Sequence, residues 1–188
     1  MQTLAPTPEH PAHAATAPLE SGKSLLRMSV GTEVLAVPIE YVREILEVSR
    51  LTPLPRTPDF VGGAMNLRGA VVPVIDLAAR LGMPASVLGR RSCIVVVESA
   101  QAQEPESADE TLDEVTGSAV VGLLVDAVFE VFDTPVSRIE SVPALGTRIA
   151  ADLLAGMTRA RGDVIGILAL DHILSPQALT ALIAQHND

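Results

Sequence analysis

The sequence of 188 residues is poor in the residue types on which several kinds of protein depend. It contains one cysteine, no tryptophan, one tyrosine and three phenylalanines. A single cysteine excludes a framework of disulfide bonds within the chain, and so few aromatic residues exclude a platform that stacks nucleic-acid bases. No apolar run approaches the length of about 18 residues that a membrane-spanning helix requires. We therefore expect a soluble, cytoplasmic protein.

Basic residues are also scarce, and the acidic residues are unevenly distributed. The formal net charge is −10, and the segment 98–116 alone carries seven acidic residues and no basic one. The rest of the chain has a net charge of only −3, which provides no basic footprint for DNA or RNA. Two interpretations of the acidic segment stay open: a solvated spacer, or a source of electrostatic repulsion that excludes wrong partners.

The N-terminal residues 1–22 do not have the pattern of a folded segment. They combine four prolines with many alanines and show no hydrophobic period, which predicts a disordered tail. The segment does not have a charged start followed by an apolar core, so we do not expect a signal peptide. The sequence thus predicts one folded domain over residues 23–184, which contains an acidic loop at 99–117.

Most of the folded region has the pattern of short β-strands. The expected strands are rich in Val, Ile and Leu and are bounded by Gly, Pro, Ser or Asp. They cover residues 25–30, 33–38, 71–77, 92–98, 120–125, 128–132 and 164–170. Gly31-Thr32 predicts a hairpin, and we expect one helical turn at 77–81 that Gly82 closes. Ser175 and Pro176 predict the start of a short C-terminal helix.

Two blocks of sequence occur twice, in the same order. The first block pairs residues 36–46 (AVPIEYVREIL) with residues 122–132 (GLLVDAVFEVF), at an offset of 86. The second pairs residues 63–77 (GAMNLRGAVVPVIDL) with residues 156–170 (GMTRARGDVIGILAL), at an offset of 93, and aligns Arg68-Gly69 with Arg161-Gly162. The shared order indicates an internal duplication and predicts two similar all-β halves joined in one body.

No group of side chains predicts catalysis. Cys93 lies in the apolar run SCIVVV, where a free cysteine is typically a small core residue rather than a reactive thiol. The histidines show no metal-ligand spacing with Cys93 or with an acidic pair; they are His10, His13, His172 and His186. The sequence contains neither a G-x-S-x-G elbow nor a phosphate-binding glycine-rich loop with lysine. We therefore expect no enzyme activity, no cofactor and no bound metal.

The remaining candidate is a surface feature, the turn Asn66-Leu67-Arg68-Gly69. Gly69 can adopt a positive φ, so this turn would hold Arg68 at the tip of a hairpin. An arginine there is either a solvated turn charge or a planar donor fork presented to a partner, and spacing alone favours the solvated charge. The segment 39–45, in which charges alternate with apolar residues, by itself indicates an amphipathic element with a solvated face.

Residues 42–84 resemble the CheW family of chemotaxis coupling proteins. The resemblance is carried by VREIL, by the LTPLP segment, by NLRG followed by VVPVIDL, and by RLG. Further on, VVGLLVDAVFEV and LLAGMTRARGDVIGILALDHIL resemble the second half and the closing segment of that family, so the similarity covers residues 22–184. It implies an all-β fold, with two similar SH3-like five-stranded β-barrel subdomains in one CheW-like domain, a short C-terminal helix and a disordered N-terminal tail.

The resemblance also implies a role as a non-catalytic adaptor. Members of the family couple the cytoplasmic tips of methyl-accepting chemoreceptors to the regulatory domain of a CheA-type histidine kinase, without binding nucleic acid or inserting into the membrane. The positions that match the receptor-facing surface of the family are Val42, Glu44 and Arg68, with supporting contacts from Ile39, Asn66 and Leu67. Kinase contacts lie on both halves in this family, and the sequence does not assign them to residues.

This sequence departs from the family pattern at three places, and other functions stay open. Ala78 stands where an arginine is common after the IDL motif, and both the acidic segment and the proline-alanine tail are longer than usual. One alternative is an adaptor of a pilus-motility or other alternative chemosensory system. A hypothesis of a different class is an enzyme or small-ligand receptor with a cleft between the halves, which no motif supports.

Overall fold

The computed structural model describes residues 22–99, 119–143 and 148–174. The strands in this part of the chain are β1 (Gly22–Val30), β2 (Glu33–Pro38), β3 (Val42–Glu47), β4 (Val61–Leu67), β5 (Ala70–Asp76), β6 (Cys93–Ser99), β7 (Ala119–Val125), β8 (Ala127–Pro135), β9 (Leu154–Ala160) and β10 (Asp163–Leu168). The short α-helices are α1 (Leu77–Arg80) and α2 (Leu170–Ile173). Single 3₁₀ turns form η1 (Ile39–Tyr41), η2 (Val136–Arg138) and η3 (Ala151–Leu153).

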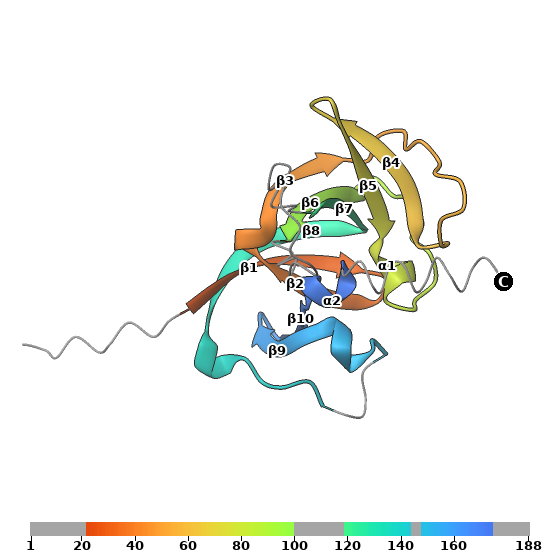
Figure 1. Cartoon of the computed structure of the whole chain (residues 1–188). Helices are drawn as coiled ribbons and strands as arrows, with labels where there is room; N and C mark the ends of the chain where they lie inside the picture. The colour runs from red at the N-terminus through yellow and green to blue at the C-terminus, as the bar shows by residue number, and fades with distance from the viewer. Residues whose placement is uncertain (1–21, 100–118, 144–147, 175–188) are drawn as a thin grey trace, which may run out of the picture.

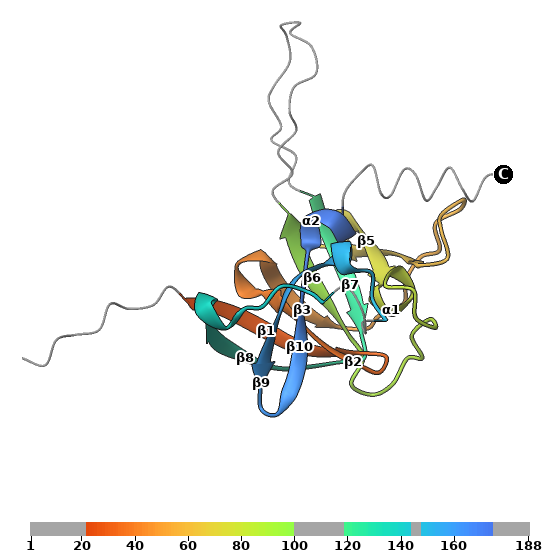
Figure 2. The same cartoon turned by 90° about the horizontal axis from the view of Figure 1, so that it is seen from below.

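The strands form two five-stranded sheets, which are both mainly antiparallel. Sheet A has the order β8-β1-β2-β10-β9, and sheet B has the order β3-β6-β7-β5-β4. In Figure 1, β4 and β5 of sheet B lie at the top and β9 of sheet A lies at the bottom. Seen from below, the blue β9–β10 hairpin lies over β1 and β2, and β10 pairs with β2 (Figure 2). The expected all-β class with two similar five-stranded units is confirmed.

The two repeats of the sequence exchange strands between the sheets. The first repeat supplies β1 to β5 and α1, and the second supplies β6 to β10 and α2. In chain order, β1 to β5 correspond to β6 to β10. When each strand of sheet A is replaced by its counterpart in this series, the result is the strand order of sheet B. Each sheet therefore takes two strands from one repeat and three from the other. Strands of different repeats meet at the parallel pairs β2–β10 and β5–β7 and at the antiparallel pairs β1–β8 and β3–β6.

The main hydrophobic core is built jointly by both sheets. Its fully buried residues include Met28 and Leu35 of sheet A, Val97 and Leu123 of sheet B, and Ile173 of α2. Two smaller clusters lie apart from it, one formed by residues of sheet B and the other by residues of sheet A. Because burial of apolar surface is the main favourable term in folding, this shared core makes the two sheets one folding unit.

Hydrogen bonds of the α1 residue Arg80 join the ends of the two repeats. The guanidinium Nε donates to the backbone oxygen of Ile173 at 3.3 Å, and Nη2 donates to that of His172 at 3.2 Å. The same side chain lies over the ring of Phe60, with 5.6 Å from Cζ to the ring centroid. Burial lowers the pKa of Arg80, and the carboxylate of Asp152 opposes that shift. These carbonyl groups at the end of α2 are thus capped by a cation from the other repeat.

Each strand expected from the sequence is present, with small differences at its ends. The helical turn is also present as α1, and Gly82 beyond it has a φ of +79°. Leu77 and Leu170, expected as the last residues of strands, instead begin α1 and α2. Three strands were not expected: β3, whose alternating charges indicated only an amphipathic element, and β4 and β9, which contain glycine and few β-branched residues.

Several expectations fall outside the described residues. They concern the tail at 1–22 apart from Gly22, the acidic loop at 99–117 apart from Ser99, and the helix after Pro176. Gly22 begins β1, and Ser99 ends β6 and pairs with Ala119. Within the described ranges, no helix is long and apolar enough to cross a membrane.

Candidate functional site

The turn between β4 and β5 places Arg68 at the tip of a tight hairpin. Leu67 pairs with Ala70, which leaves Arg68 and Gly69 as a two-residue loop with φ values of +53° and +92°. Positive φ at both central residues is the mark of the type I′ turn, whose twist suits a hairpin. The Asn66 side-chain oxygen accepts a hydrogen bond from the Gly69 amide at 2.9 Å. The guanidinium group is therefore presented on a rigid support, with its side chain 81% exposed.

Arg68 forms an ion pair with Glu44 on β3. Its Nη2 lies 3.2 Å from Oε2 of Glu44, whose side chain is 24% exposed. A pair this open to solvent contributes about 0 to 1 kcal/mol to stability. Holding Arg68 in the left-handed region costs about 1 to 2 kcal/mol. The pair therefore fixes the direction of the guanidinium group more than it stabilises the fold.

The other expected contact residues are placed less favourably for direct contact. Val42 and Ile39 are partly buried and pack against the main core, and Leu67 packs against the smaller core of sheet B. A register shift in β3 separates Val42, which pairs with Val97, from Glu44, which pairs with Val96. The structure thus brings together Arg68, Glu44 and the supporting Asn66, while Val42, Ile39 and Leu67 contribute mainly to the cores below.

The second repeat carries a matching ion pair. Arg161 and Gly162 form the two-residue loop between β9 and β10, with φ values of +53° and +88°. Arg161 Nε lies 2.9 Å from Oε1 of Glu130, and Glu130 is the counterpart of Glu44 in the repeat. The arginine turn and its glutamate are therefore features of the duplicated fold, present in both sheets.

The two pairs differ because a second arginine binds the glutamate of sheet A. Arg27 on β1 has its Nη1 3.5 Å from Glu130 and its Nη2 2.5 Å from Asp163, and it lies over the Phe129 ring with 4.8 Å from Cζ to the centroid. Glu130 is thus shared by two guanidinium groups. Glu44, in the described part of the chain, has Arg68 as its only ion-pair partner.

Sequence reasoning missed Arg27, and the structure shows why the residue matters. Leu25 pairs with Phe132 in sheet A, and Ile94 pairs with Leu46 in sheet B. Phe132 and Leu46 are counterparts in the repeat, so Leu25 corresponds to Ile94. Arg27, two residues after Leu25, therefore corresponds to Val96. Val96 is fully buried in the core of sheet B, whereas the Arg27 side chain is 15% exposed. The one available signal was a charged residue inside the apolar run LLRMSV.

Asp76 and Cys93 have structural roles. Asp76 of the PVID motif is buried, and its carboxylate caps α1 and accepts hydrogen bonds from the Ser86 amide at 2.7 Å and the Ser86 hydroxyl at 2.8 Å. Burial raises the pKa of the Cys93 thiol, and a hydrogen bond with the backbone of Val128 opposes the rise. The thiolate of Cys93 is therefore disfavoured, and its side chain packs against the main core. Among the described residues, no cluster of three or more His, Cys, Asp or Glu could hold a metal ion.

Comparison with known proteins gives a consistent set of similarities. A family model described as CheW-like domain matches residues 24–178. The chain is 33% identical over 152 residues to the chemotaxis protein CheW of Rhizobium meliloti (strain 1021), with 81% of this chain and 87% of that protein covered. It is 36% identical over 147 residues to protein FrzA of Myxococcus xanthus, with 77% and 81% covered.

A solved structure is also similar to this fold. The crystal structure of the scaffolding protein TtCheW from Thermoanaerobacter tengcongensis matches with a TM-score of 0.69 and 28% sequence identity. The match covers 89% of this chain and 96% of that one. It therefore includes both sheets as well as the sequence motifs.

Proposed function

Since this chain belongs to the CheW-like domain family, we propose that it is a non-catalytic adaptor of chemotaxis signal transduction. In this proposal it couples the cytoplasmic tips of chemoreceptors to a CheA-type histidine kinase. Its place is then the cytoplasmic side of receptor arrays, which it reaches through its partners. The names of its relatives and of the similar scaffolding protein support this role.

The observation that carries the proposal is the Arg68–Glu44 pair at the tip of the β4–β5 hairpin. We assign receptor binding to Arg68, Glu44 and Val42, with Ile39, Asn66 and Leu67 in support. An exposed guanidinium fork on a rigid turn can donate several hydrogen bonds to a partner. Val71, which pairs with Asn66 beside the turn, is 74% exposed and offers apolar area next to the charge.

The second pair, Arg161–Glu130, is less suited to the same task. Arg27 also binds Glu130, so a partner that drew Arg161 away would disturb a network of four charged groups. Among the described residues, Arg68 binds a single carboxylate, that of Glu44, so a partner's acceptor would replace only this one contact. The repeat thus supplies two similar hairpins, and we assign recognition of the receptor to the hairpin of sheet B.

Co-purification tests the coupling role. A tagged cytoplasmic receptor fragment is mixed with a CheA-type kinase, with and without this chain. We expect the kinase to be retained by the receptor fragment only when the chain is present. Equal retention in the absence of the chain, or no retention in its presence, would contradict the proposed function.

A further inference from the structure

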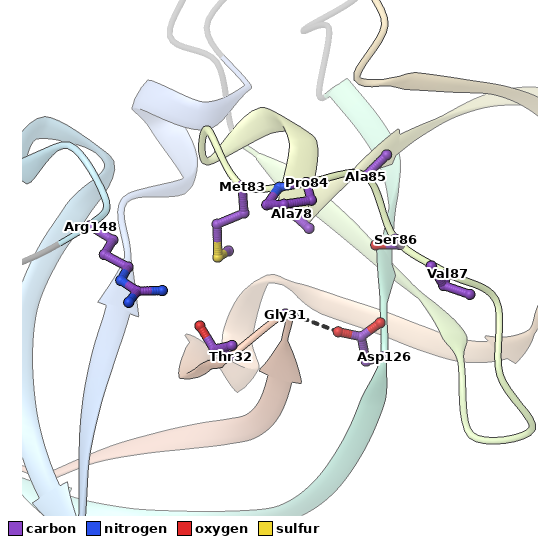
Figure 3. Close-up of a pocket in the computed structure, with 10 residues that line it drawn as sticks. All are labelled: Gly31, Thr32, Ala78, Met83, Pro84, Ala85, Ser86, Val87, Asp126 and Arg148. Carbon is purple, nitrogen blue, oxygen red and sulfur yellow. Dashed lines mark hydrogen bonds between the residues drawn. The ribbon is translucent and has the colours of Figure 1, made fainter.

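A cavity lies at the opposite end of β5 from Arg68. It has a volume of about 390 Å³ and separates the β1–β2 hairpin tip from the loop that joins α1 to β6. Because Arg68 precedes β5 and α1 follows it, the length of this strand separates the cavity from the Arg68 turn by about 20 Å. The lining residues are Gly31, Thr32, Ala78, Met83, Pro84, Ala85, Ser86, Val87, Asp126 and Arg148 (Figure 3).

Hydrogen bonds fix both walls of this cavity. On one side, the Asp126 carboxylate accepts from the Gly31 amide at 2.5 Å, and the Asp126 amide donates to the Ser29 oxygen at 3.0 Å. On the other side, the buried Asp76 holds Ser86 through two hydrogen bonds. The cavity is therefore preformed, which lowers the entropic cost of binding.

The lining is largely apolar and carries one cation, Arg148, and one carboxylate, Asp126. Ala78, Met83 and Val87 contribute hydrophobic surface, and the side chain of Arg148 extends into the space opposite Asp126 (Figure 3). Asp126 is already bound by the Gly31 amide. Arg148 forms no ion pair with any residue in the described ranges. The Gly31 amide is neutral, so Asp126 keeps its negative charge and balances Arg148 in the lining. The excess of positive charge comes from Arg90 and Arg91 in the adjoining loop, although the whole chain is strongly acidic.

Beyond the lining residue Val87, the loop between α1 and β6 continues with apolar and basic side chains, and we call residues 87–91 the rim. Val87 is 87% exposed and Leu88 is 61% exposed. Arg90 and Arg91 follow in the same loop, are exposed, and form no ion pair with the described part of the chain. Hydrogen bonds between Gly89 and Ser92 close the loop at its far end. A site with so open a rim suits side chains of another protein better than a small molecule, which binds in an enclosed pocket.

We propose that this cavity and its rim are a docking site for an acidic, apolar peptide segment of a partner protein. One apolar side chain of the segment fills the space between Met83 and Val87. A neighbouring carboxylate binds Arg148, and further carboxylates bind Arg90 and Arg91. The site is separate from the Arg68 hairpin and does not depend on the proposed receptor contact.

A peptide titration followed by NMR tests this proposal with the full-length chain. The probe is acetyl-Glu-Leu-Asp-Leu-Glu-amide, and its matched control is acetyl-Gln-Leu-Asn-Leu-Gln-amide. We expect the acidic peptide to shift the amide signals of Thr32, Ala78, Met83 and Val87 in a saturable manner. The neutral peptide should bind at least about tenfold more weakly, because it cannot form charge-assisted hydrogen bonds.

Two variants separate this site from a general attraction between charges. Arg148→Glu should weaken binding of the acidic peptide at least about tenfold. Arg138→Glu, an equal change of charge at an exposed position that does not line the cavity, should alter it less than about twofold. Absence of saturable shifts up to about 10 mM peptide, shifts centred elsewhere, or equal effects of the two variants would each overturn the proposal. Receptor capture is a separate measurement, which Arg148→Glu should leave unchanged.

Discussion

Arg68 and Arg161 share a backbone conformation but not an electrostatic environment. Both have a φ of +53° and both bind the glutamate that their repeat supplies. The difference comes from Arg27, which stands at the position of Val96 and also binds Glu130. Two differences between the repeats, Arg27 in place of Val96 and Asp163 in place of Ala70, thus make the Arg161 turn part of a charge network. The Arg68 turn keeps a single ion-pair partner in the described chain.

Replacing Arg27 should therefore destabilise the protein. Arg27→Ala removes two ion pairs and the packing of the guanidinium group on Phe129. Because its carboxylate partners are partly exposed and can be solvated, we expect a loss of about 1 to 2 kcal/mol in the free energy of unfolding. Urea denaturation followed by circular dichroism measures this loss.

The control for Arg27→Ala is Arg43→Ala, which removes an ion pair with Glu98 from a side chain that is 53% exposed. That change should cost less than about 0.5 kcal/mol. Equal stability of the two variants would contradict the assignment of Arg27 to the interior of sheet A.

At the scale of elements, register shifts allow the edge strands to bend and meet neighbouring segments. β4 has such a shift between Val61 and Gly63, and Ala64 forms an isolated bridge with Thr52. In β9, Met157 forms the equivalent bridge with Glu140. Gly63 is the residue that permits the close approach, because its φ is +131° and an added Cβ would lie 2.6 Å from the Thr52 oxygen.

Gly63→Ala should destabilise the fold strongly. The added methyl group meets backbone rather than a flexible side chain, and alanine is strained at this φ, so we expect a loss of about 2 to 4 kcal/mol. The neighbouring Gly62 has no positive φ, and its added Cβ would meet Leu51 at 3.5 Å, an ordinary contact. Thermal unfolding should therefore show a much smaller decrease in midpoint for Gly62→Ala than for Gly63→Ala.

The same elements explain what sequence reasoning could reach. Strands with continuous runs of valine, isoleucine and leucine, such as β6 and β7, were predictable because both faces are buried. β4 and β9 were not predictable, because their glycines allow distant segments to approach at the bridges but lower the strand propensity of the sequence. The motifs and the resemblance identified Arg68 and Glu44 as candidates. Their contact across 24 residues of sequence depends on the folding of β3 against β4–β5, which no local pattern shows.

At the scale of the whole molecule, the exchange of strands makes the two repeats dependent on each other. Each sheet needs strands from both repeats, and the main core contains residues of both. The sequence predicted the duplication and two similar units. It could not show that each unit combines both repeats, because pairing between β2 and β10 or between β5 and β7 involves residues more than 40 positions apart.

Separated repeats should therefore not fold alone. We expect fragments 1–88 and 89–188, cut at the exposed tip of the α1–β6 loop, to lack a cooperative unfolding transition when each is isolated. Mixed in equal amounts, they should regain β-structure and a cooperative transition, because association restores both sheets. Circular dichroism with thermal denaturation measures this. A cooperative transition in the isolated first fragment would contradict the exchange.

The most direct test of the whole account compares the two arginine turns in receptor binding. Arg68→Glu and Arg161→Glu make the same change in charge at equivalent hairpin tips. For Arg68→Glu we expect the affinity for a receptor cytoplasmic fragment to fall at least about 30-fold, which corresponds to about 2 kcal/mol, through loss of a central donor. For Arg161→Glu we expect a change of less than about threefold. Unchanged receptor binding by Arg68→Glu, or equal losses in the two variants, would contradict the account.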